Sequence, residues 1–337
     1  MHLRLTRRSF MGAALTVGFD RLRARPLAQG HVDFSFVQYH NQPETSPLHD
    51  ALTGMWSSIK AETRGRVDTK VFPRNNNIEG SDPAALRALM AGEIQFFTVM
   101  GGILGTVVPA ADVQQMPFVF RSAAHACRAM DGPLGTYLRE ELAAKGIVGF
   151  RGGAFDNGMR QIGGRKRPIV RPDDLVGIRM RVPAGQVVAD TFKALGAEPV
   201  TINSDGIYAA LQSGRVDAQE NPLLLFELFK LYEVAPYVSL TSHMWSGFNL
   251  VAHQPTWTQL PGDIKAAIER NVPKYVRTQR RLQENENQAA RRRLAMHGLT
   301  FNEVESAPFR DRLSGLYGSW KERLGTRCWS LLTDSLR

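Results

Sequence analysis

Ala88-Leu89-Met90-Ala91-Gly92-Glu93-Ile94-Gln95 and Ala210-Leu211-Gln212-Ser213-Gly214-Arg215-Val216-Asp217 share one pattern of residue types. In both stretches a helix is expected to end at the glycine, and a strand to begin at the aliphatic residue two positions later. Each stretch stands in a series of alternating strands and helices, so the pair predicts two α/β lobes of similar topology. Ligands of such sheets bind outside the carboxyl ends of the strands, which predicts a cleft between the lobes.

Apolar periodicity predicts the elements around these two stretches. The first series has strands at 32–37, 67–71 and 94–99, with helices from Pro47 to Gly65 and from Asp82 to Gly92, and is expected to form a mostly parallel sheet. The second series has strands at 177–182, 199–202 and 215–218, with helices at 187–195 and between Ser204 and Gly214. A polar helix from Asp263 to about Met296 is long enough to brace both lobes, and Pro273 is a candidate kink.

The net charge of +10 suggests an acidic partner, but half of it lies in residues 1–30, which hold six arginines and one aspartate. A basic start, a small apolar stretch at 12–18 and a small-residue exit near Ala28 are typical of an export signal. The pair Arg7-Arg8 before Ser9-Phe10 resembles the twin-arginine kind of signal. A short amphipathic helix is the alternative interpretation. No apolar run approaches the length of about 18 residues that spans a bilayer.

The sequence lacks the motifs of common catalytic and cofactor sites: Gly-x-Ser-x-Gly, the P-loop, His-Glu-x-x-His and paired Cys-x-x-Cys. Gly101 to Gly105 resembles a dinucleotide loop only loosely. His40 and His49 could share a metal, although a surface or hydrogen-bonding role is the expected one. Asp156 and Glu220 could form a carboxylate pair, yet nothing in the sequence places them together. We therefore expect a binding protein and not an enzyme, with no cofactor and no metal.

Two further features have a plain and a functional interpretation. The arginines of the long helix could form a nucleic-acid patch, but acidic residues interleave them and no nucleic-acid motif accompanies them, so a solvated helix face is expected (277, 280, 281, 291, 292, 293). Cys127 and Cys328 could form a disulfide in an oxidising compartment. Two unpaired, buried thiols are the expected state.

The strand Gly177-Ile178-Arg179-Met180-Arg181-Val182-Pro183 places two arginines on one face. A guanidinium pairs well with a carboxylate through two parallel hydrogen bonds, and charge-assisted bonds are worth roughly 1.5–3 kcal/mol each. This strand and the following 190–197 resemble the central segment of the DctP-type solute-binding proteins of TRAP transporters. The resemblance continues, in order and at family spacing, through other parts of the chain (116–121, 156–160, 166–169, 211–222, 231–234).

The resemblance implies an α/β fold like that of the type II periplasmic binding proteins, with two lobes around a central ligand cleft and a long helix bracing both. It implies that Arg181 makes the principal salt bridge to the carboxylate of the ligand and that Arg160 adds a second contact. It also implies that Asn221 orients the carboxylate, with Glu220 beside it. Trp245 and Phe248 are candidates for covering the ligand; ordinary core aromatics are the alternative.

Two segments depart from the family pattern, and both are expected to line the first-lobe side of the cleft. Asn75-Asn76-Asn77-Ile78-Glu79-Gly80 stands where many relatives read Gly-Gln-Leu-Gly, and His40-Asn41-Gln42-Pro43 alters an early His-Pro region. Asn77 is therefore a further candidate ligand contact. We expect one lobe from residues 31–157 plus 247–285, and the other from 158–246 plus 286–337.

These inferences predict a monomeric periplasmic protein that captures a small organic acid, with dicarboxylates as the reference ligands of the family. It would deliver the acid to the membrane subunits of a TRAP permease. A periplasmic receptor that presents a carboxylate to a sensor kinase is the alternative function. An exported hydrolase on the same scaffold is disfavoured, because no nucleophile and base are paired.

Overall fold

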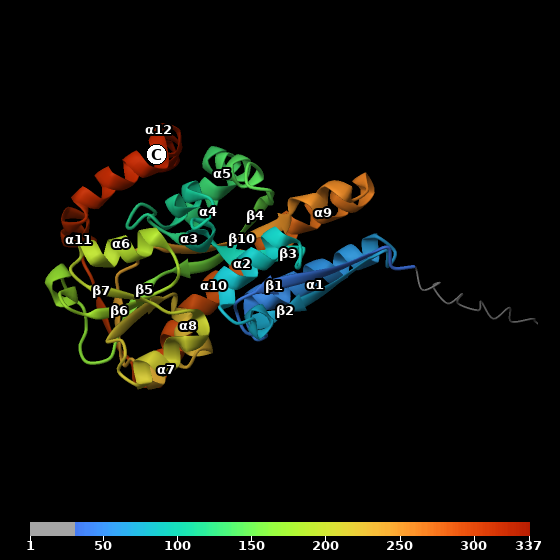
Figure 1. Ribbon diagram of the computed structural model, residues 1–337. Helices are drawn as coiled ribbons and strands as arrows, with labels where there is room; N and C mark the ends of the chain where they lie inside the picture. The colour runs from blue at the N-terminus through green and yellow to red at the C-terminus, as the bar shows by residue number, and fades with distance from the viewer. Residues whose placement is uncertain (1–30) are drawn as a thin grey trace, which may run out of the picture.

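The computed structural model describes residues 31–337, so the predicted export signal at 1–30 lies outside the described residues. The chain forms two β-sheets with helices packed around them (Figure 1). The first lobe is built on a five-stranded sheet with the order β2-β1-β3-β10-β4. The second lobe is built on a six-stranded sheet with the order β11-β9-β5-β8-β6-β7. The predicted two-lobed α/β fold is confirmed.

The strands are β1 Phe34–His40, β2 Val67–Phe72, β3 Phe96–Met100, β4 Ile147–Met159, β5 Gln161–Gly164, β6 Arg179–Val182, β7 Glu198–Thr201, β8 Ala218–Asn221, β9 Tyr237–Leu240, β10 Trp245–His253 and β11 Thr300–Glu303. The α-helices are α1 Pro47–Glu62, α2 Ser81–Ala91, α3 Gly101–Leu104, α4 Ala123–Asp131, α5 Pro133–Ala143, α6 Gln186–Ala194, α7 Ile207–Gln212, α8 Leu223–Leu228, α9 Gln254–Gln259, α10 Gly262–Met296, α11 Ser306–Arg312 and α12 Ser314–Ser335. Short 3₁₀ segments lie at η1 Pro73–Asn77, η2 Pro109–Gln115, η3 Pro172–Leu175, η4 Ser204–Gly206 and η5 Leu231–Glu233.

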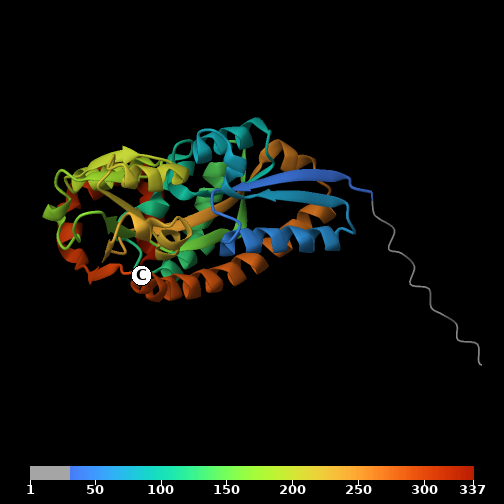
Figure 2. The same cartoon turned by 90° about the horizontal axis from the view of Figure 1, so that it is seen from below.

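The chain passes between the lobes at the crossing segments. Arg160 alone separates β4 of the first lobe from β5 of the second, and Thr241–Met244 joins β9 to β10. The long helix α10 is present as predicted, with Pro273 inside it. It packs along β4 and α1 of the first lobe and reaches α8 of the second, so it runs along both lobes (Figure 2). The last helix, α12, returns to the first lobe and packs on α5 and η2.

Local sequence signals explain most helix boundaries. Helix α1 begins where Ser46 accepts a hydrogen bond from the His49 N–H at 3.2 Å, and Pro47 occupies its first turn. The buried stripe that begins at Leu48 and ends at Ile59 faces the sheet. Helix α2 ends, as predicted, at Gly92, which adopts φ 79°.

Two predictions about the strands need correction. The strand predicted at 215–218 starts later, as β8 at Ala218–Asn221. The Val216 N–H still bonds the Ala210 carbonyl of α7 at 3.3 Å, and backbone bonds toward the neighbouring strands begin only at Asp217. Both sheets are also mixed: in the first sheet, which was expected to be mostly parallel, two of the four strand pairs are antiparallel, and in the second sheet two of the five are. Every antiparallel pair involves β5 or β10, the strands that follow the two crossings and return through the sheet in the reverse direction.

Asp112, in η2, is a carboxyl group buried without compensation. Its side chain is fully buried, and neither oxygen has a hydrogen-bond partner among residues 31–337. Burial raises its pKa to about 7; the charge of Arg323 acts against this shift, and the charge of Asp190 adds to it. Between pH 3.8, its ordinary pKa, and about 7, the folded protein therefore binds more protons than the unfolded chain. The contribution of Asp112 to stability is lost as the pH rises through this window.

We expect Asp112→Asn to stabilise the protein above pH 7 and to flatten its stability between about pH 4 and 7. The amide cannot ionise, so the folded state no longer carries a buried negative charge at neutral pH. Thermal unfolding from pH 4.5 to 8 measures both effects. Asp50→Asn, at an exposed position of α1, is the control and should run parallel to the parent. Parallel curves for Asp112→Asn would refute the assignment.

No helix in the described part of the chain is both long and apolar enough to cross a membrane.

Candidate functional site

A small cavity of about 30 Å³ lies between the two lobes. Strands of both sheets, the loops that follow them and the segments beside them supply its walls. Its lining is largely polar toward the crossing segments (Asn41, Asp82, Met100, Asn157, Arg160, Arg181, Pro183, Ser204, Ile207, Asn221, Leu225, Phe229, Ser246, Phe248). The predicted cleft thus contains two arginines, one aspartate and several amide and hydroxyl groups.

Arg160 is held by a buried ion pair with Glu220. Its Nε donates to Glu220 Oε2, and its Nη2 donates to Glu220 Oε1 at 2.6 Å and to the Glu220 carbonyl at 2.7 Å. Nη1 donates to Ser246 Oγ at 2.9 Å, and Nη2 also lies 3.3 Å from Asn221 Oδ1. Both ionic side chains are almost completely buried. Arg160 therefore has a fixed orientation, set by residues of both lobes.

The charge of Glu220 is favoured in spite of its burial. Burial alone would raise its pKa, but the charge of Arg160 and the bonds from His243 and Arg160 outweigh it and lower the pKa to about 2. His243 Nε2 lies 3.3 Å from Glu220 Oε2. Burial lowers the pKa of His243, and Glu220 opposes that shift. Arg160 and Glu220 consequently form a persistent ion pair at neutral pH.

Arg181 is buried to the same degree but has few protein partners. Its Nε donates to the Ile202 carbonyl at 2.8 Å, and this is its only hydrogen bond with the described residues. Burial lowers its pKa to about 9, with Glu220 and Asp82 opposing the shift and Arg160 adding to it, so the side chain is charged at neutral pH. The Ile202 carbonyl thus fixes the guanidinium on one side. Nη1 and Nη2 remain available for an acceptor in the cavity.

Asp82 faces this cavity from the first lobe. Its Oδ1 accepts from Asn75 Nδ2 at 2.6 Å, and its Oδ2 accepts from Asn41 Nδ2 at 2.8 Å. Burial raises its pKa, and the two amide hydrogen bonds and the charge of Arg181 offset part of that shift. Each oxygen keeps a lone pair, so Asp82 can accept hydrogen bonds from a ligand.

An unusual backbone conformation brings Asn75 to Asp82. The four residues from Arg74 to Asn77 all have φ between 50° and 54°, in the left-handed region. Such runs are costly for L-residues, and asparagine tolerates the region better than most. The run turns the Asn75 side chain inward, where it is fully buried, while Asn76 and Asn77 stay exposed.

The structure gathers most of the residues predicted from the sequence, but not all of them. Arg160, Arg181, Asn221 and Phe248 line the cavity, and Glu220 contacts it through Arg160. Trp245 is fully buried elsewhere: its Nε1 donates to Asp156 Oδ1 at 2.8 Å, and its ring fills the space that a Cβ at Gly247 would need. The plain interpretation of Trp245 as a core aromatic therefore fits the structure. Asn77 is exposed and does not line the cavity.

The other candidate chemistries do not assemble. Asp156 and Glu220 bond to different partners, Trp245 and Arg160 respectively. His40 Nε2 and His49 Nδ1 lie 3.0 Å apart within a histidine pair. No cluster of three or more metal-ligating side chains occurs within residues 31–337. Cys127 and Cys328 are free, buried thiols.

Asp82, Asn157 and Ser246 line the cavity but were not predicted to do so, whereas Asn41 belongs to the segment 40–43 that was expected there. In the sequence, Asp82 before Pro83 was interpreted as the start of a helix. That interpretation gave no reason to expect its side chain in the cavity. The signal that could have found it is the run of three asparagines just upstream. Such a run is better suited to a left-handed turn than to a strand.

Comparisons with known proteins agree with this geometry. The family model described as bacterial extracellular solute-binding protein, family 7, DctP, matches residues 38–323. The C4-dicarboxylate-binding periplasmic protein DctP of Rhodobacter capsulatus is 28% identical, over 78% of this chain and 79% of that protein.

Solved structures are similar over nearly the whole fold. A TRAP periplasmic solute-binding protein from Chromohalobacter salexigens, with bound D-glucuronate, is 27% identical with a TM-score of 0.84 and covers 89% of this chain and 99% of its own. The sugar acid binding protein DctPAm of Advenella mimigardefordensis, in complex with galactonate, is 26% identical with a TM-score of 0.84, and the match covers 90% of this chain and 97% of that one. These are binding proteins and not enzymes. The chain therefore belongs to family 7 of the bacterial extracellular solute-binding proteins, the DctP family of TRAP transporters.

Proposed function

We propose that this protein captures a sugar acid, a monocarboxylate with several hydroxyl groups, in the periplasm and delivers it to the membrane subunits of a TRAP permease. The observation that carries the proposal is that Arg181 of the second lobe and Asp82 of the first line the same cavity. Arg181 recognises the carboxylate, and Asp82 accepts hydrogen bonds from the other end of the ligand.

The free hydrogen-bond donors of Arg181 support the proposed contact with the carboxylate of the ligand. Its Nε is fixed by the Ile202 carbonyl, which orients the guanidinium plane, while Nη1 and Nη2 can donate two parallel hydrogen bonds. Arg160 is committed to Glu220, Ser246 and Asn221, so its charge is already compensated. Arg181 is thus the principal anchor, and Arg160 stiffens the wall beside it.

Asp82 and the amides around it support the proposed contacts with the hydroxyl groups of the ligand. A second carboxylate placed near Asp82 would meet a like charge in a buried site, which disfavours binding. Hydroxyl groups would instead donate to the free lone pairs of Asp82, and Asn41 and Asn157 add polar groups on the same wall. Relatives with bound D-glucuronate and with galactonate support a sugar acid, whereas the name of the Rhodobacter relative supports a dicarboxylate.

The size of the cavity implies a movement of the lobes. A volume of about 30 Å³ accommodates at most a few water molecules, since one water needs roughly 10–15 Å³ by this measure. A hexuronate is much larger, so the lobes must lie farther apart when it enters and when it is held. Capture is then a shift between open and closed populations of the two lobes.

A thermal-shift screen tests the proposal. We expect D-glucuronate, D-galacturonate or galactonate to raise Tm more than succinate, and D-glucose to leave it unchanged, because a ligand that binds the folded state stabilises it by mass action. At a concentration 100 times Kd the stabilisation amounts to about 2.7 kcal/mol. A larger increase in Tm with succinate than with every sugar acid would contradict the role of Asp82 as an acceptor for hydroxyl groups. An increase with glucose alone would contradict the role of Arg181 in binding a carboxylate.

Asp82→Ala provides a second, more specific test. We expect affinity for the best sugar acid to fall at least tenfold, because its hydroxyl groups lose a buried acceptor, while the affinity for succinate rises. Isothermal titration with both acids measures the change. Asp205→Asn is the matched control: this aspartate is exposed and near Arg181 but does not line the cavity. Equal effects of both substitutions on both acids would reject the role of Asp82.

The cellular context of the proposal rests on the family and on residues 1–30. Relatives are named as periplasmic, which supports a periplasmic location for this chain. Export by the twin-arginine route and a monomeric state remain predictions from the sequence. Delivery to a permease and presentation to a sensor kinase share the same binding step, and the TRAP relatives favour delivery.

A further inference from the structure

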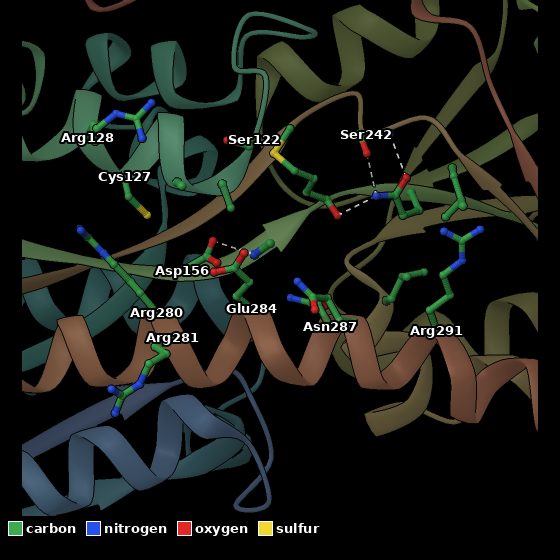
Figure 3. Close-up of a pocket in the computed structure, with 18 of the residues that line it drawn as sticks. Ser122, Cys127, Arg128, Asp156, Ser242, Arg280, Arg281, Glu284, Asn287 and Arg291 are labelled. Atoms are coloured by element: carbon green, nitrogen blue, oxygen red, sulfur yellow. Dashed lines mark hydrogen bonds between the residues drawn. The ribbon is translucent and has the colours of Figure 1, made fainter.

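A second space adjoins the cavity that contains Arg181, on the side of α7 and α8. It measures about 420 Å³, and we call it the outer cavity. Ser204 and Phe229 line both cavities, so the two spaces meet at these side chains. By contrast, the cavity of about 740 Å³ that lies against α10 shares no lining residue with the cavity of Arg181 (Figure 3).

Both lobes contribute to the walls of the outer cavity. Arg74, in η1, comes from the first lobe, while Tyr208 of α7 and Lys230, between α8 and η5, come from the second. A ligand held at Arg181 can therefore extend past Phe229 along the same interface between the lobes. A volume of about 420 Å³ falls within the range of roughly 300–1,000 Å³ that is usual for pockets that bind small molecules.

The side chains of the outer cavity combine an aromatic wall with hydrogen-bonding groups of both kinds. The ring of Tyr208 is oriented by its hydroxyl, which donates to Glu233 Oε2 at 2.6 Å. Within residues 31–337, no hydrogen bond or ion pair engages the side chains of Arg74, Lys230 and Asp205, which line the cavity. Cationic groups donate hydrogen bonds, carboxylates accept them, and a hydroxyl group can do both. This set of groups suits a ring that carries several hydroxyls.

The charges of the outer cavity balance. Arg74 and Lys230 are its cations, and Asp205 and Glu233 are its carboxylates. A second acidic group would be attracted by the first pair and repelled by the second, so the cavity has no net charge with which to select an anion. A neutral sugar unit avoids this conflict, and the apolar C–H face of its ring can pack against the aromatic wall.

We propose that the ligand is a disaccharide acid, whose acid unit binds at Arg181 and Asp82 and whose second, neutral sugar unit occupies the outer cavity. The inference rests on the proposed function, because the acid unit uses the site already described. Ser204 and Phe229 then flank the linkage between the two units. A monosaccharide acid leaves the outer cavity to water, whereas a disaccharide acid fills it and gains contacts with both lobes. Affinity therefore rises with the second unit.

Isothermal titration with matched acids tests the inference. Lactobionate and cellobionate each carry a neutral hexosyl unit on the same acid unit, D-gluconate. We expect at least one of these aldobionates to bind with a Kd at least about fivefold below that of D-gluconate. Digalacturonate, which carries a second carboxylate, should gain less over D-galacturonate.

The outcomes separate the inference from the proposed function. A smaller gain, or none, with both aldobionates would overturn the inference, while binding of the monosaccharide acids would still support the proposed function. A gain with digalacturonate alone would overturn the neutral character of the second unit. If no sugar acid binds, the proposed function fails, and the inference fails with it.

Two substitutions test whether the second unit lies in the outer cavity. Arg74→Asn removes the first-lobe cation and places there a residue that tolerates the left-handed backbone, φ 50°. Arg64→Asn is the matched control, because Arg64 is also exposed, adopts φ 54° and does not line the cavity. Tyr208→Ala removes a ring from the second-lobe wall, and Tyr237→Ala, in β9 and outside the cavity, is its control.

The readout is the ratio of the Kd for D-gluconate to the Kd for the preferred aldobionate. We expect Arg74→Asn and Tyr208→Ala each to lower this ratio at least about threefold, and both controls to leave it unchanged. A general structural defect would weaken both acids alike and would not change the ratio. Unchanged ratios in both cavity variants would show that the second unit binds elsewhere, and would overturn the inference.

Discussion

Arg181→Ala is expected to weaken binding of the cognate sugar acid at least 100-fold. The guanidinium is buried, is fixed at Nε by Ile202, and offers Nη1 and Nη2 to a carboxylate in the cavity. Removing one partner of a buried, hydrogen-bonded charge pair costs about 2–5 kcal/mol, and each 1.4 kcal/mol is about tenfold in Kd. Isothermal titration with D-glucuronate or D-galacturonate measures the loss.

Arg179→Ala is the matched control, since the same strand carries both arginines. Arg179 is half-exposed and bonded to Asp217 outside the cavity, so its removal should leave Kd within about twofold, as expected for a surface pair. Arg181→Lys keeps the charge but loses the planar fork, and an intermediate Kd is expected. The fold should tolerate Arg181→Ala, because burial of the unpaired charge already lowers the pKa of Arg181 to about 9. Equal affinities of Arg179→Ala and Arg181→Ala for the acid would refute the assignment of Arg181 as the main carboxylate contact.

Glu220→Gln is expected to destabilise the protein more than any other single substitution considered. It leaves Arg160 charged, buried and without its carboxylate partner, which costs about 3–5 kcal/mol. In domains of 150–250 residues each kcal/mol lowers Tm by about 2–4 °C, so a fall of roughly 6–20 °C is expected. The effect depends on pH. The lowered pKa of Glu220 stabilises the fold above pH 4.5, its ordinary value, and that contribution fades as the pH falls toward about 2.

Two further variants isolate the buried pair. Glu227→Gln breaks an ion pair with Arg293 at the surface and should cost less than about 1 kcal/mol. The double variant Arg160→Met/Glu220→Gln removes both charges and should recover most of the lost stability, since a buried ion pair replaced by apolar groups is often neutral. Thermal unfolding at pH 7 compares all three. Similar losses for Glu220→Gln and Glu227→Gln would show that burial of the pair does not matter.

The sequence predicted the fold where local signals and packing agree. Ser46-Pro47 and Gly92 place helix ends correctly, because capping groups and left-handed glycines act within one turn of the chain. The antiparallel course of β10 between β3 and β4 was not predictable in this way. It depends on residues more than 80 positions apart, and nothing in its own composition specifies its partners.

The residues of the candidate site likewise fall into those that a sequence pattern predicts and those that it does not. Arg181 could be predicted to face the cleft because its strand has a distinctive pattern, and Arg160, Asn221 and Glu220 were predicted from the same resemblance. Arg160, Arg181 and Asn221 line the cavity, and Glu220 bonds Arg160; their contacts with a ligand stay predictions. Asp82 was not predicted to line the cavity, and Asn77, which was, is exposed, because a run of left-handed residues decides which of three neighbouring asparagines turns inward. Backbone conformations of this kind are set by the surrounding structure and leave only a weak trace in residue types.

The position of β10 also constrains how this protein folds. Residues 245–253 lie in the middle of the first sheet, between β3 and β4, and α12 completes the packing of the same lobe. The first lobe thus lacks a central strand until nearly all of the second lobe has been synthesised. We therefore expect that neither half folds as an independent unit and that contacts between distant segments slow folding. We also expect the two lobes to unfold together in one cooperative transition. During folding, we expect the unfolded chain to be long-lived.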